Sequence, residues 1–87
     1  MSAMVSYESA ILRRVITPDE GDMTPDLARY VLSLDFTPAD HDRIAALSAS
    51  AQEGTLTPDE AAELDGYLRV NDLLAILQSK ARQSLRA

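Results

Sequence analysis

Each of the four prolines in this 87-residue chain follows a threonine, and these Thr-Pro pairs limit what the chain can fold into. The full form, Thr-Pro-Asp-Glu, stands at residues 17–20 and 57–60, and shorter forms begin at Thr24 and Thr37. Threonine is a good N-cap of a helix, proline fits the first helical position, and early acidic residues favour the helix dipole. A glutamate at the third helical position can also complete a capping box. The pairs therefore indicate helix starts rather than an acidic ligand loop.

The helix starts and the apolar spacing predict an all-α fold, a small bundle of three to four helices with a long C-terminal helix. We expect the whole chain, residues 1–87, to form a single helical domain. Residues 16–23 should form a connection, because Gly21 stops any helix that begins at Thr17. No segment shows the alternation of a β-strand. The predicted helices cover about residues 6–15, 25–34, 38–53 and 58–85.

The last predicted helix is the longest and the most apolar. Gly66 lies inside it and Asn71 can cap a new start, so an unbroken helix and a break between these two residues both stay open. Apolar side chains nearly all round a helix are typical of one that is central or is covered by a partner. We therefore predict that this helix contacts a partner or a second copy of the chain through Leu73, Leu74, Ile76 and Leu77.

The first predicted helix is short, and one apolar stripe runs along it. Tyr7, Ile11 and Val15 recur at the spacing of one helix face. This spacing supports a helix at about residues 6–15.

Negative charge is concentrated in the middle of the chain, whose total net charge is −6. Residues 17–72 hold thirteen of the fourteen acidic residues and three arginines, which gives −10. Such a surface repels phosphate backbones, so we expect no direct nucleic-acid binding and a basic protein as the partner. Asp59 and Glu63 belong to the predicted partner surface. Three bases near the end are expected to favour the dipole of the last helix: Lys80, Arg82 and Arg86.

Cysteine and long apolar runs are both missing from the sequence. The absence of cysteine excludes disulfides and thiolate metal sites. We see no signal peptide, and the longest apolar runs, such as residues 73–77, are too short to cross a bilayer. The expected location is the cytoplasm, with no membrane contact.

Few residues offer catalytic or ligand-binding chemistry. His41 is the only histidine, and one imidazole without cysteine cannot build a zinc site. An EF-hand loop counted from Asp19 would need a glutamate at its twelfth position, where Tyr30 stands. There is no glycine-rich phosphate loop, and nothing singles out a serine as a nucleophile. We predict that the protein is not an enzyme, with no catalytic residue, no metal site and no cofactor.

A longer pattern runs through residues 14–82 and includes the helix starts. The family form of the pattern reads RVI.P..G.L.P..AR..L.L.F...D..R...L...A..G.LT..E..EL..Y and continues through a leucine-rich stretch to QSKAR. The chain carries Met23 where the pattern has its first leucine and ends the pattern at residues 78–82. With this pattern the chain, from Ile11 onward, resembles a family of short uncharacterised bacterial proteins. The resemblance implies gene neighbours of the HNH nuclease type, which would suit an antitoxin, immunity or accessory role. The motif positions are caps and core residues, so the resemblance implies no catalytic residue.

Two functions follow as hypotheses. The first is a small acidic, non-catalytic protein-binding module, an antitoxin-like or accessory partner of a basic, nuclease-like protein toward which its charge steers it. The alternative is a self-assembling structural or regulatory helical dimer with no nuclease partner, because a leucine-rich helix on a thin core favours a symmetric pair. The two can coexist, and we expect a homodimer.

Overall fold

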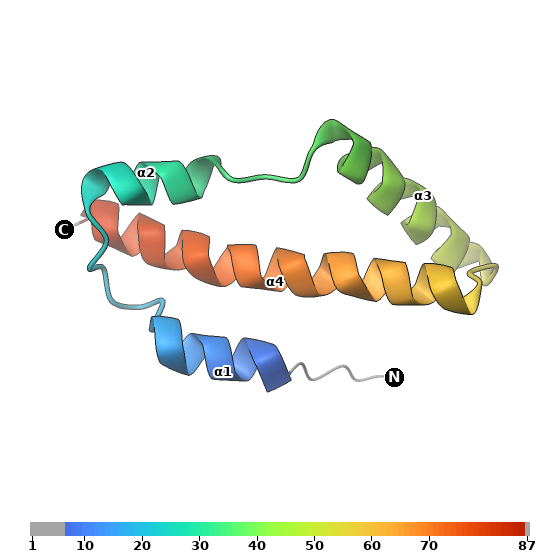
Figure 1. Cartoon of the computed structure of the whole chain (residues 1–87), viewed down its shortest axis with the longest axis horizontal. Helices are drawn as coiled ribbons and strands as arrows, with labels where there is room; N and C mark the ends of the chain where they lie inside the picture. The colour runs from blue at the N-terminus through green and yellow to red at the C-terminus, as the bar shows by residue number, and fades with distance from the viewer. Residues whose placement is uncertain (1–6, 87) are drawn as a thin grey trace. The chain divides into compact units, whose positions relative to one another are not determined.

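The computed structural model describes residues 7–86, and its helices follow the start signals of the sequence. Residues 7–86 contain no strand, so the predicted all-α fold with a long last helix is confirmed. The observed ends lie within one residue of the predicted ones, and the predicted start at Ser6 lies outside the described residues. The helices are α1 (Tyr7–Ile16), α2 (Pro25–Ser33), α3 (Pro38–Glu53) and α4 (Pro58–Arg86) (Figure 1).

Three of the four Thr-Pro pairs begin helices. The Thr57 hydroxyl accepts a hydrogen bond from the Glu60 amide at 3.1 Å, and the Glu60 carboxylate accepts one from the Thr57 amide at 2.9 Å. This pair is the complete capping box that the sequence predicts. Thr24 and Thr37 each accept one hydrogen bond from the amide three residues later. At the other end of α3, Gly54 adopts a left-handed conformation, with a φ of 72°.

The first Thr-Pro pair ends a helix instead of starting one. The Thr17 amide donates to the carbonyl of Arg13 at 3.0 Å, and the Thr17 carbonyl accepts from the Glu20 amide at 3.0 Å. Thr17 has a φ of 48°, a left-handed conformation that commonly closes a helix C-terminus but is costly for a branched side chain. The same four residue types thus end α1 at 17–20 and begin α4 at 57–60.

The chain divides into two compact units that share α4. Unit 1 consists of residues 1–34 and 71–87, and unit 2 consists of residues 35–70. Helix α4 is continuous from Pro58 to Arg86, so the unbroken helix is found and the break between Gly66 and Asn71 is not. The single domain that we expected stays a prediction.

The core of unit 1 lies where α2 packs on the C-terminal half of α4 (Figure 1). Ala28 and Ala81 are fully buried and Val31 is nearly so, with Leu77 packed against them. Small side chains at the contact let the two helix backbones approach closely. The side-chain amide of Gln78 donates to the carbonyls of Val31 and Leu34, at 3.3 and 2.9 Å. It thus supplies hydrogen-bond donors to backbone carbonyl groups at the C-terminal end of α2.

Lys80 of α4 binds the connection between α1 and α2. Its side chain is buried, and its ammonium group lies 2.8 Å from the Asp22 carboxylate and 3.1 Å from the Glu20 carbonyl oxygen. The hydrogen bond and the charge of Lys80 lower the pKa of Asp22. We predicted that Lys80 favours the helix dipole, but its ammonium group instead binds a segment about 60 positions earlier in the chain.

Gly21 lies against the backbone of α4 in the same region. A Cβ atom at this position would lie 2.6 Å from backbone atoms of Gln83 and Ser84, closer than real carbon contacts. The Ser84 hydroxyl accepts a hydrogen bond from the Met23 amide at 3.0 Å, which fixes the approach. The glycine is therefore required here for close packing, in addition to ending the turn.

The predicted apolar stripe of α1 faces away from the chain. Tyr7 is 78% exposed, Ile11 is 49% exposed and Val15 is 73% exposed, and α1 has no fully buried residue. Its half-buried side chains are Ser9, Leu12 and Ile16. The apolar side chains of α1 that are half-buried are therefore Leu12 and Ile16, and not those of the stripe.

Candidate functional site

The candidate site lies in unit 2, where α3 packs beside the N-terminal half of α4. Leu47 is the most buried side chain of α3 and is 1% exposed. Phe36 precedes α3, and its ring meets the Tyr67 ring edge-to-face at 5.7 Å between centroids. These contacts hold the first turn of α3 next to the middle of α4.

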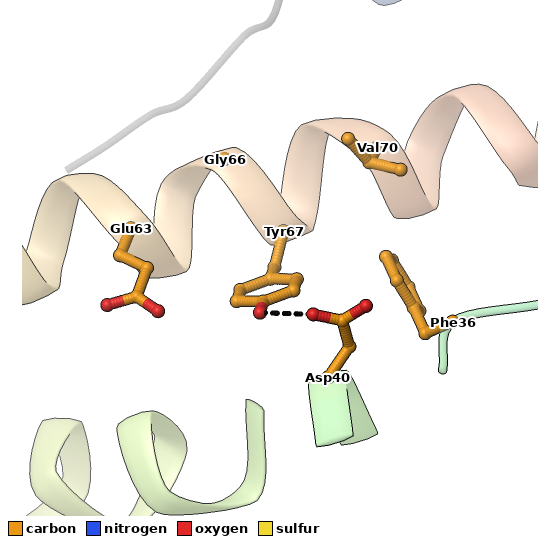
Figure 2. Close-up of a pocket in the computed structure, with 6 residues that line it drawn as sticks. All are labelled: Phe36, Asp40, Glu63, Gly66, Tyr67 and Val70. Carbon is orange, nitrogen blue, oxygen red and sulfur yellow. Dashed lines mark hydrogen bonds between the residues drawn. The ribbon is translucent and has the colours of Figure 1, made fainter. Parts of the chain in front are cut away.

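A hollow of about 490 Å³ opens between these elements. Figure 2 shows Glu63 and Tyr67 extending from α4, while Asp40 reaches toward Tyr67 from the first turn of α3. Aromatic and aliphatic side chains supply most of the wall, and two carboxylates supply its charge. The residues that line the hollow are Phe36, Asp40, Glu63, Gly66, Tyr67 and Val70.

Asp40 and Tyr67 form the central hydrogen bond of the site. The Tyr67 hydroxyl donates to one Asp40 carboxylate oxygen at 2.7 Å, and the Thr37 hydroxyl donates to the other at 2.9 Å. These two bonds, with Tyr67 the stronger influence, lower the pKa of Asp40. The same bond, together with burial, raises the pKa of Tyr67. At neutral pH the site therefore holds an ionised carboxylate and a protonated phenol.

Glu63 and Arg43 form a two-pronged ion pair at the edge of the hollow. Both Arg43 nitrogens that face Glu63 donate to its carboxylate, each at 2.8 Å. The hydrogen bonds lower the pKa of Glu63 and raise that of Arg43. Planar paired bonds of this type fix both side chains in one orientation. Glu63, predicted as a partner contact, is thus held in place by its own chain.

His41 lies at the margin of the site, and its side chain is exposed. Its ring meets the Phe36 ring edge-to-face at 5.9 Å between centroids, and its Nε2 atom lies 3.1 Å from the Asp35 carboxylate. The hydrogen bond from His41 lowers the pKa of Asp35. The histidine therefore supports Phe36 and Asp35 from outside the hollow.

The structure separates the six residues predicted to bind a partner. Asp59 is exposed in the first turn of α4, and Glu63 lines the hollow. Ile76 is 1% exposed within the single chain, so its side chain is already buried by its own chain. We therefore exclude Ile76 from the contact surface. The sequence suggested it because an apolar position alone does not reveal which face is covered. The remaining three are half-buried: Leu73, Leu74 and Leu77.

Sequence inspection missed five members of the hollow, namely Phe36, Asp40, Gly66, Tyr67 and Val70. Gly66, Tyr67 and Val70 fall on one face of α4 with Glu63, at the helical spacing, and this signal was available. Asp40 lies in the first turn of a helix, where an acidic residue is expected in any case, so its position does not indicate its second role beside Tyr67. Its partner lies 27 positions away, and no local pattern joins the two.

Among residues 7–86, no three His, Cys, Asp or Glu side chains are grouped so that they could hold a metal ion. In the same part of the chain, no helix combines the length and apolar character needed to cross a membrane. No protein-family model matches the chain, and no curated protein or solved structure is significantly similar to it. The geometry of the site is therefore the main guide to function.

Proposed function

We propose that this chain is a small acidic, non-catalytic module that binds a basic protein, in an antitoxin-like or accessory role toward a nuclease-like partner. The distribution of charge between the two units carries the proposal. Unit 2 contains eight acidic residues and two arginines, a net charge of −6, which equals that of the whole chain. Unit 1 contains six acidic and six basic residues and is neutral.

The neutrality of unit 1 has a structural basis. The acidic connection between α1 and α2 lies beside the basic end of α4, and the Asp22–Lys80 pair joins them. We therefore assign the net negative charge to residues 35–70, a shorter region than the predicted residues 17–72. A partner steered by charge would be drawn to unit 2, because long-range attraction follows the net charge of a surface.

The protonation states in the hollow favour binding over catalysis. A general base near neutral pH needs a pKa raised toward 7, whereas that of Asp40 is lowered. A tyrosine nucleophile or base needs a lowered pKa, whereas that of Tyr67 is raised. Both groups are suited to holding a fixed shape and a fixed charge.

Charge reversal in unit 2 should slow association with the protein that co-purifies from the native host. Glu53 and Asp59 are exposed, so we expect Glu53→Lys and Asp59→Lys each to lower the association rate severalfold at low salt and to change the dissociation rate little. The difference should shrink at physiological ionic strength, where the screening length is about 8 Å. Stopped-flow or surface-plasmon kinetics across a salt series would measure it.

Asp19→Lys is the matched control, because Asp19 is exposed but belongs to neutral unit 1. It changes the total charge by the same amount and should slow association less. Equal effects of all three reversals, or rates that ignore salt, would contradict a role for unit 2. In that case the acidic residues would serve solubility alone.

The alternative function is a self-assembling structural or regulatory dimer, and the exposed stripe of α1 favours it. Three large apolar side chains on one helix face, Tyr7, Ile11 and Val15, are the usual material of a helix–helix interface. We expect light scattering at micromolar concentration to show a dimer that Ile11→Glu dissociates. Because Ile11 is half-exposed, the variant should stay folded, and a wild-type monomer at these concentrations would refute the alternative.

A further inference from the structure

The hollow of unit 2 combines two features that together suit a cationic side chain. Phe36, Tyr67 and Val70 supply an apolar and aromatic wall, and Asp40 and Glu63 bring two carboxylates to it. An aromatic ring face attracts a cation placed over it, and a carboxylate pairs with the same cation at its rim. Aliphatic or anionic groups would leave one of these two features unused.

Both carboxylates are fixed before any partner arrives. Asp40 is held by Tyr67 and Thr37, and Glu63 is held by Arg43. Each oxygen accepts one hydrogen bond from these groups and has a second lone pair available. Fixing acceptors in advance lowers the entropy lost on binding.

The surrounding charge stays negative after the internal pairs are counted. Four carboxylates belong to this region, Asp35, Asp40, Glu60 and Glu63, and one guanidinium, that of Arg43, lies among them. Arg43 neutralises only part of this charge. An incoming cation therefore meets a net attraction.

Gly66 keeps the hollow open. A Cβ atom built on it would meet no atom within 4 Å, so this part of the α4 surface carries neither its own side chain nor a neighbour's. The hollow is shallow, opens to solvent and measures about 490 Å³, so a side chain can lie in it from outside.

We propose that this hollow receives an arginine side chain of the basic partner. Arginine suits it better than lysine, because a flat guanidinium stacks on an aromatic ring while it bonds to carboxylates at its edge. The inference rests on the proposed function and adds the location and the chemical group of the contact. It places the contact between the start of α3 and the middle of α4.

The test uses the intact chain and hexa-arginine as the probe, followed by nuclear magnetic resonance. Hexa-citrulline, which has nearly the same shape without the charge, is the matched probe. We expect hexa-arginine to shift the amide signals of Gly66, Tyr67 and Val70 most, and hexa-citrulline to shift them little. Gly66→Leu fills the hollow and should weaken hexa-arginine binding by about tenfold. Ala75→Leu adds the same side chain at an exposed position of α4 in unit 1 and should leave binding unchanged.

The outcomes separate this inference from the proposed function. Gly66→Leu binding as tightly as wild type, or shifts spread evenly over the acids of unit 2, would overturn the arginine site and leave the acidic module standing. Equal binding of hexa-citrulline would also overturn it, because the cation would then be irrelevant. Failure of hexa-arginine to bind at low salt would count against both proposals.

Discussion

Replacing Ile76 by alanine should destabilise the protein more than any other single truncation in α4. The side chain is 1% exposed, and removal of a buried isoleucine costs about 2–5 kcal/mol through lost burial and the cavity left behind. A chain of this size has a total stability of roughly 4–13 kcal/mol, so the loss is a large fraction of it. Urea unfolding followed by far-ultraviolet circular dichroism would measure the difference.

Ile11→Ala is the matched control, because it removes the same atoms from the exposed stripe of α1. At 49% exposure it should cost well under half as much as Ile76→Ala. An unchanged unfolding midpoint for Ile76→Ala, together with weaker self-association, would return Ile76 to the partner surface. That result would restore the original sequence-based prediction.

Replacing Gly21 by alanine should be the second most damaging change, although it adds only a methyl group. The new Cβ atom would lie 2.6 Å from the backbone of α4, and backbone atoms cannot move aside as a flexible side chain can. Overpacking of this kind costs about 1–3 kcal/mol. The connection would have to lift from α4, which weakens the Lys80–Asp22 pair. Each kcal/mol should lower the melting temperature by about 4–8 °C in a domain of this size.

The other two glycines provide the controls for Gly21. Gly66→Ala meets open space in the middle of a helix and should stabilise the chain by about 0.5–1 kcal/mol. Gly54→Ala also meets open space but sits at a φ of 72°, and the left-handed strain should cost about 1 kcal/mol. Equal effects at Gly21 and Gly66 would show that the connection does not pack on α4 as described.

Most of the helix boundaries could be predicted from the sequence. Thr57 and Glu60 bond to each other across three residues, and Gly54 ends α3 through its own backbone conformation. Interactions between residues three or four positions apart depend only on the local sequence, so the local residue pattern is enough to predict these helix ends. The first Thr-Pro pair shows the limit, because residues 17–20 carry the same side chains as residues 57–60 and end a helix instead.

The candidate site was only partly predictable. Glu63 was chosen for its charge, and it does line the hollow, but its ion pair with Arg43 joins residues 20 positions apart. Asp40 lies three residues after Thr37, and Tyr67 lies inside the last helix, so their sequence positions do not indicate that they meet. Their hydrogen bond depends on how α3 returns beside α4, which no local pattern specifies.

The sequence alone determined that the fold is all-α, where most of the described helices begin and end, and that the net charge is −6. Only the tertiary structure decided which apolar faces are covered, burying Ile76 and exposing Tyr7. It also brought Lys80 to Asp22 and grouped residues 1–34 with 71–87, whose charges sum to zero, so unit 2 carries all of the net charge. The physical reason is the separation in sequence between the interacting groups. Caps and turns are settled by groups three or four residues apart, whereas burial and charge pairing depend on segments about 60 residues apart that meet only in the folded chain.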